Sequence, residues 1–206
     1  MKDRGLSVEA RLDAPDYAVE RRYIAMELAL ARREMENTRH WVPFSYPGLG
    51  ILKRSDWQKY IHELEKYSRE LDRSEQDVRE GLLPLIFMVE NGHDQPVQNL
   101  RVKVAVQNGQ VRPKHKSPTR PLRVDGAPNQ ANTPPLKRSW GFSRRRVKIT
   151  AHTVEAELSR LEARDNAHLV SQTLHVDARH GARLHFEIVS SRTDDQGEVK
   201  LPAHAA

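Results

Sequence analysis

The clearest pattern of apolar and polar positions lies between Leu85 and Val106. Apolar and polar residues alternate with a period of two at both ends of this stretch, which is typical of β-strands with one buried face. Between the two runs, Asn91-Gly92 and Asp94-Gln95-Pro96 favour a turn. The pattern therefore predicts two strands joined by a polar segment. The side chains expected on their buried faces are Leu85, Phe87, Val89, Leu100, Val102, Val104 and Val106.

A second alternating region lies near the C-terminus. A three-residue loop, Arg179-His180-Gly181, would place the apolar residues before and after it on one face of a hairpin. The same register would pair Asp177 with Arg183 and His175 with His185 on the outer face. The buried side chains of this hairpin would be Leu174, Val176, Leu184, Phe186 and Ile188. A short last strand is expected at 198–201. Residues 154–161 fit a strand or a helix turn, and their neighbours favour the strand.

Two segments in the first part of the chain have the 3.6-residue period of helices. The first, 16–37, begins at Asp16 as N-cap. It carries one apolar stripe of Val19, Tyr23, Met26 and Leu30 and another of Ile24, Leu28, Ala31 and Met35. The second, 55–81, has the spacing of a heptad seam, formed by Trp57, Tyr60, Leu64, Tyr67, Leu71, Ser74 and Val78. The seam requires a partner helix, which is either the first helix or a second copy of the chain.

These elements predict an α+β fold with N-terminal helices on a mostly antiparallel β-sandwich. We expect a helical region at 1–82, a β-sandwich at 83–201 with a long Pro-rich loop at 109–146, and a tail at 202–206. The sequence VENGHDQPVQNLRVKVAV, residues 89–106, resembles the strand pair of immunoglobulin-like β-sandwich modules in bacterial multidomain proteins. Together with the preceding helix, the resemblance covers about residues 55–201. It implies a cytosolic bacterial setting, with antiviral defence as one such context, and it brings no catalytic residues.

Composition limits the chemistry that is open to the chain. The chain of 206 residues has no cysteine, which excludes disulfides and thiolate catalysis and fits a reducing cytosol. Its start lacks the apolar core of a secretory signal, and it has no apolar run long enough to span a bilayer. We therefore expect a cytoplasmic protein that does not enter a membrane.

No catalytic or cofactor motif is found in the sequence. The chain has no G-x-S-x-G, no phosphate-binding G-x-x-x-x-G-K-[ST] and no dinucleotide fingerprint. The expected histidine pair, His175 and His185, supplies two ligands, and two ligands do not complete a zinc site. We expect no enzyme activity, no cofactor and no metal.

Charge is concentrated in one segment. The net charge is +6, and residues 109–148 contain eleven Lys or Arg and one acid. Such a segment suits an acidic protein partner, or the phosphates of a nucleic acid on which its aromatic residues stack. The candidate binding residues are Arg112, Lys114, Lys116, Arg120, Arg123, Lys137, Arg138, Trp140, Phe142, Arg144, Arg145 and Arg146.

The sequence favours a non-catalytic adaptor or assembly subunit. Its seam, formed by Trp57, Tyr60, Leu64, Tyr67, Leu71 and Val78, would contact another subunit or a second copy, and the basic loop would bind an acidic partner. The alternative is a nucleic-acid-binding subunit that contacts phosphates through residues 109–148.

Overall fold

The computed structural model describes residues 5–37, 54–113, 115–123, 146–191, 194–199 and 201. They form two helices and ten strands in two antiparallel sheets, which makes the fold α+β. The chain divides into two compact units. The β unit contains Met1–Ala14, Gln76–Ser117 and Lys137–Ala206, and the helical unit contains Pro15–Glu75 and Pro118–Leu136.

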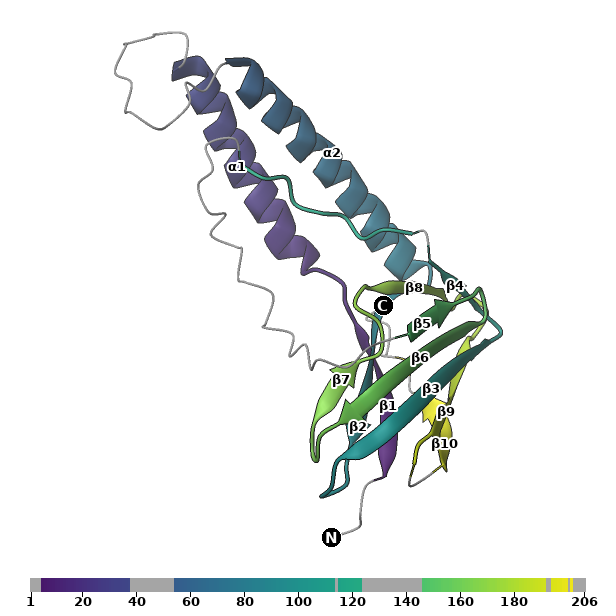
Figure 1. Ribbon diagram of the computed structural model, residues 1–206. Helices are drawn as coiled ribbons and strands as arrows, with labels where there is room; N and C mark the ends of the chain where they lie inside the picture. The colour runs from purple at the N-terminus through teal and green to yellow at the C-terminus, as the bar shows by residue number, and fades with distance from the viewer. Residues whose placement is uncertain are drawn as a thin grey trace. The chain divides into compact units, whose positions relative to one another are not determined.

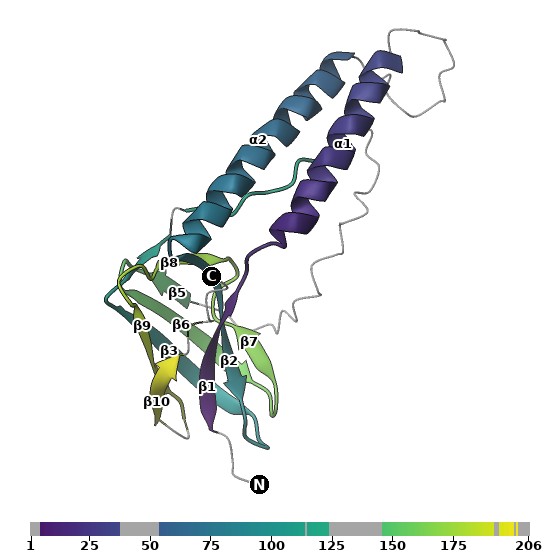
Figure 2. The same cartoon turned by 180° about the vertical axis from the view of Figure 1, so that it is seen from behind.

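The helical unit is built on two antiparallel helices, α1 (Tyr17–Asn37) and α2 (Arg54–Arg79), which lie side by side (Figures 1 and 2). The helix bounds match the prediction to within two residues. Asp16 caps α1 as expected, because its Oδ1 accepts hydrogen bonds from the backbone N–H groups of Ala18 at 3.0 Å and Val19 at 3.1 Å.

The heptad spacing correctly predicts the buried side of α2. Its residues from Trp57 to Ser74 at the predicted positions are buried, and all of them except Ser74 form one cluster with Tyr23, Ile24 and Ala31 of α1. Because α1 supplies a partner helix within the same chain, the intramolecular alternative accounts for the seam. Val78, the last seam position, packs instead against the core of the β unit.

One predicted stripe of α1 is wrong at two of its four positions, since Tyr23 is buried and Leu30 is half-buried. Val19 and Met26 are 49% and 57% exposed, although the apolar spacing placed them on a packed face. The buried face of α1 is centred instead on Glu20 and Glu27. A helix can bury an acid only where the acid is paired, and the partners are described with the site below.

The β unit contains two sheets. The first has the order β1-β2-β8-β4, with β7 also paired to β2, and the second has the order β10-β9-β3-β6-β5. The strands of the first sheet are β1 (Leu6–Leu12), β2 (Leu82–Asn91), β4 (Gln110–Arg112), β7 (Asn166–His168) and β8 (Leu174–Asp177). The strands of the second are β3 (Val97–Gln107), β5 (Arg146–Ile149), β6 (Thr153–Leu161), β9 (Arg183–Val189) and β10 (Asp194–Val199).

A single hydrophobic core lies between the two sheets, since their buried residues form one cluster. All seven side chains predicted to face inward from β2 and β3 are in it. Asn99, at φ 53°, interrupts the alternation of β3. Val97 and Leu100 are therefore both buried, although they are three residues apart.

The prediction missed β1. Leu6, Val8 and Ala10 alternate with polar residues and are buried, and the strand pairs with β2 from Leu6 opposite Asn91 to Leu12 opposite Leu85. The expected helical region 1–82 is therefore wrong at its start. The alternation is present in the sequence, but it is short and lies next to a helix.

The predicted C-terminal hairpin is also wrong, although its buried side chains are right. Gly181 has the expected positive φ, 72°. However, β8 pairs with β2 and β4, while β9 pairs with β3 and β10. Alternation identifies the buried face of a strand but does not identify its sheet, and two facing sheets share one core. Asp177 and His175 consequently do not lie opposite Arg183 and His185.

Candidate binding groove of the helical unit

An extended segment, Pro118–Arg123, lies along the two helices of the helical unit (teal in Figures 1 and 2). Proline fixes φ near −65° and also restricts the residue before it to extended conformations. Pro118 and Pro121 therefore favour polyproline II, which has three residues per turn. The exposure repeats with the same period, since Thr119 and Leu122 are exposed and the other four residues are partly buried.

The first group of contacts joins this segment to both helices through Glu20. Arg120 donates from Nε to Glu20 Oε2 at 2.7 Å and from Nη2 to Oε1. The hydroxyl of Tyr67, on α2, donates to the same Oε2 at 2.7 Å. The Arg120 guanidinium carbon also lies 4.4 Å from the centre of the Tyr23 ring, within the range of a cation–π contact. The carboxylate of Glu20 is therefore buried with three hydrogen-bond donors.

A second group repeats the first. The hydroxyl of Tyr60 donates to Glu27 Oε2 at 2.9 Å, and Arg123 Nη1 lies 3.4 Å from Glu27 Oε1. The two groups, Glu20–Tyr67–Arg120 and Glu27–Tyr60–Arg123, are called here the two rungs.

The spacing of the rungs follows from elementary geometry. Seven residues advance about 10.5 Å along an α-helix, which separates Glu20 from Glu27 on α1 and Tyr67 from Tyr60 on antiparallel α2. Three residues of polyproline II, the conformation that Pro118 and Pro121 favour, advance about 9.3 Å, which is the spacing expected between Arg120 and Arg123. The three segments thus have nearly equal repeats.

The protonation states support the pairing. Burial raises the pKa of Glu20, but the hydrogen bonds from Arg120 and Tyr67 outweigh it and leave the pKa below its ordinary value. Burial and the neighbouring carboxylates raise the pKa of Tyr67 and Tyr60, and the Tyr23 hydroxyl contributes at Tyr60. The face of α1 and α2 that this segment covers, called here the groove, therefore presents the Glu20 carboxylate among neutral phenol groups.

The structure places the predicted basic residues in different environments. Arg120 and Arg123 pair with Glu20 and Glu27. Arg112 pairs with Asp177, at 3.3 Å between Nη2 and Oδ2. Lys116 and Arg146 are exposed. The remaining candidates lie outside the described residues: Lys114, Lys137, Arg138, Trp140, Phe142, Arg144 and Arg145. Three of the five described candidates thus bind acids of their own chain.

Asp177 ends β8 next to two arginines. Arg179 donates from Nε to Asp177 Oδ1 at 2.9 Å, and Arg112 shares the other oxygen. These hydrogen bonds, the one from Arg179 first, hold the pKa of Asp177 well below its usual range. Asp177 therefore has different partners from the predicted one.

His175, on β8, is paired with a histidine that was not predicted as its neighbour. The rings of His175 and His115 lie 4.4 Å apart between centroids, and His115 Nε2 lies 3.3 Å from Asp77 Oδ2. His175 is 3% exposed. Burial, and then the neighbouring His115, lowers its pKa to about 4. Antiparallel pairing of β4 with β8, with Arg112 opposite His175, brings these residues together.

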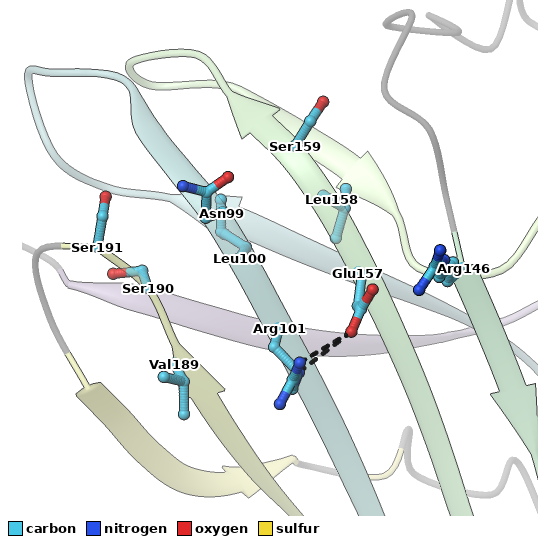
Figure 3. Close-up of a pocket in the computed structure, with 10 residues that line it drawn as sticks. All are labelled: Asn99, Leu100, Arg101, Arg146, Glu157, Leu158, Ser159, Val189, Ser190 and Ser191. Carbon is cyan, nitrogen blue, oxygen red and sulfur yellow. Dashed lines mark hydrogen bonds and ion pairs between the residues drawn. The ribbon is translucent and has the colours of Figure 1, made fainter.

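A shallow hollow of about 600 Å³ lies on the second sheet, over β3, β6 and β9 (Figure 3). Across it, Arg101 donates to Glu157 Oε1 from Nε at 3.2 Å and from Nη2 at 3.0 Å. The described residues that line the hollow include Ser159, Ser190 and Ser191.

The described residues show neither a metal-binding cluster nor a membrane-spanning helix. No group of three or more His, Cys, Asp or Glu side chains there is placed to hold a metal ion. Neither helix in this part of the chain is long and apolar enough to cross a membrane.

Comparison with known proteins adds no relative. A scan against models of protein families finds no match to this chain, and a search of curated proteins finds none either.

Proposed function

We propose that this chain is a non-catalytic adaptor subunit of a multi-protein assembly, and that its basic segment binds an acidic partner. The observation that carries the proposal is the attachment of this segment within the fold. Within it, Pro118–Arg123 is held on the helices by the two rungs, and Arg146–Ile149 forms β5. Held flanks reduce the entropy that a binding segment loses when it docks.

The residues between these flanks supply the docking chemistry. They include Lys137, Arg138, Arg144 and Arg145, together with Trp140 and Phe142. Aromatic and arginine side chains are the residue types that most often dominate protein interfaces. An acidic protein surface with apolar recesses is the partner that this composition suits.

The β unit supports an immunoglobulin-like module as the scaffold. The first, second and eighth strands lie in one sheet in the order β1-β2-β8, and β10-β9-β3 lie in the other. This order corresponds to A-B-E and G-F-C of the immunoglobulin fold. Such modules in bacterial multidomain proteins serve as accessory domains, in agreement with an adaptor role and with the cytosolic setting that the resemblance implies, antiviral defence included.

A protein partner is favoured over nucleic acid by the pairing of Arg112, Arg120 and Arg123. Arginines bound to acids of their own chain release few counterions on meeting a phosphate backbone, so they contribute little to nucleic-acid affinity. The unpaired positive charge that remains is smaller than the sequence suggests.

The proposal is tested by purifying the tagged chain from its native host at moderate salt, with and without nuclease. We expect a stoichiometric protein to remain bound after nuclease treatment. The variant K137A/R138A/R144A/R145A should lose this protein.

A matched control, R22A/R33A/R69A/R73A, removes four exposed positive charges from the helices and should keep the partner. Recovery of nucleic acid alone, lost on nuclease treatment, would contradict the proposal. So would equal loss of the partner in both variants.

A further inference from the structure

The groove of the helical unit has the features of a peptide-binding site. Three tyrosines, Tyr23, Tyr60 and Tyr67, contribute to its buried cluster, and two buried carboxylates are spaced along it. Grooves lined by aromatic residues are the usual binding sites for proline-rich peptides, because such peptides already hold the polyproline II conformation in solution. The segment that lies in this groove has that character.

The sequence of the bound segment is a repeat. Residues 118–123 read Pro-Thr-Arg-Pro-Leu-Arg, which is Pro-x-Arg twice. In each triplet, the arginine reaches a glutamate of α1, and the middle residue, Thr119 or Leu122, faces solvent. Leu122 is 79% exposed. The middle position is therefore free to vary, whereas the arginine of each triplet is determined by its glutamate.

The contacts favour arginine over lysine. Arg120 reaches both oxygens of Glu20 with two donors and also lies over the ring of Tyr23. An ammonium group is a compact charge and lacks this planar, forked geometry. The second arginine must follow three residues later, because Glu27 lies seven residues after Glu20.

We infer that this groove is a binding site for polyproline II peptides with two consecutive Pro-x-Arg triplets on another protein, and that residues 118–123 are its tethered internal ligand. A tethered segment acts at an effective concentration in the millimolar range. The internal ligand thus fills the groove in the isolated chain, and a partner's triplets bind by displacing it. This inference concerns the acidic groove and does not depend on the acidic partner proposed for the basic segment.

The test uses the full chain and a fluorescent peptide with the sequence of residues 117–123, SPTRPLR. In the variant R120A/R123A the internal ligand loses its two charged contacts. We expect saturable binding of the peptide to this variant, at least about tenfold tighter than to the unaltered chain, in which the tethered segment competes.

Matched controls separate recognition from general charge attraction. The variant E20Q/E27Q/R120A/R123A should not bind the peptide. A peptide with lysine in place of both arginines, SPTKPLK, should bind at least about tenfold more weakly than SPTRPLR, because each lysine loses the forked contact.

The variant R120K/R123K covers the case in which R120A/R123A fails to fold, since it keeps a positive charge beside each carboxylate. It should also bind SPTRPLR more tightly than the unaltered chain does. Hydrogen exchange of α1 and α2 reports that the helices are intact. Absence of peptide binding to either variant with protected helices would overturn the inference, and so would equal binding in the presence of E20Q/E27Q.

Discussion

The two units of this protein bury different kinds of side chains. Among the described residues, the β unit buries the polar side chains of Asn91, His175 and Asp177 next to its apolar cluster, whereas the helical unit buries two glutamates, Glu20 and Glu27, beside its tyrosines. The acids are neutralised by arginines about one hundred residues further along the chain. The apolar cluster of the β unit is thus formed by side chains that alternate along its own strands. The buried acids of the helical unit need positively charged partners from a segment that is distant in the sequence.

The largest effect should come from placing an unpaired acid in the apolar core. Val104 lies in the middle of β3 and is fully buried. We expect Val104→Asp to destabilise the β unit by more than about 4 kcal/mol, because the carboxylate finds no partner there. Hydrogen exchange of β3, β6 and β9 should show lost protection. The control Gln107→Asp, at an exposed position of the same strand, should cost no more than about 1 kcal/mol.

Mild acid should destabilise the β unit before it destabilises the helical unit. The pKa of folded His175 is about 4, below the ordinary 6.5, so the unfolded chain binds this proton more readily. The resulting stability is complete above about pH 6.5 and is lost as the pH falls to about 4. The loss reaches about 3 kcal/mol at 1.36 kcal/mol per pKa unit. The groups acting on His175 are His115, Asp77 and Asp13.

Glu20, in the helical unit, should lose its contribution to stability only at a lower pH than His175. Its pKa lies below the ordinary 4.5, so its contribution is complete above about pH 4.5 and declines only below that value. Exchange measured from pH 7 to pH 4.5, corrected for intrinsic rates, should show strands β2 and β8 losing protection before α1 and α2. The variant His175→Asn should remove the pH dependence in this range. Earlier loss of protection in the helices would contradict the assignment.

Removal of one rung should affect the helical unit alone. Arg120→Ala leaves the buried Glu20 without its charged partner, and we expect a loss of about 2–3 kcal/mol, somewhat less than for a fully buried pair. Thermal unfolding followed by exchange of α1 and α2 measures the change. Leu122→Ala, in the same segment but exposed, should stay within about 0.5 kcal/mol. Similar losses for the two variants would show that the segment packs without specific pairing.

The sequence predicts the elements of this fold better than their partners. Apolar spacing identifies both helices and the buried faces of β2, β3, β8 and β9, and residue type identifies the cap at Asp16. The spacing of apolar residues depends on whether the element is a helix or a strand. It does not depend on which element packs against the buried face. The assignment of β8 and β9 to a single hairpin is wrong for the same reason, because either of two facing sheets satisfies the same alternation.

The candidate groove could not be predicted from apolar spacing. Glu20 and Glu27 look like solvated charges on a helix, since an acid is normally exposed. Their burial depends on Arg120 and Arg123, which are distant in sequence. The signals present are the heptad interval between the two acids, the heptad interval between Tyr60 and Tyr67, and the repeated Pro-x-Arg triplet. Only the matching of these three periods in space shows that they belong together.

The smallest predicted effect concerns the start of α1. Asp16 caps the helix through the N–H groups of Ala18 and Val19, and Asp16→Ala should cost about 1 kcal/mol, while Asp16→Asn should be nearly neutral. The cap is four residues before Glu20, so loss of the first turn weakens the helix that positions the first rung. Exchange should therefore increase at the N-terminal end of α1 and not in the sheets. An equal increase in β3 would show that the two units unfold together, and the contrast between an autonomous apolar core and a core that depends on paired charges would then fail.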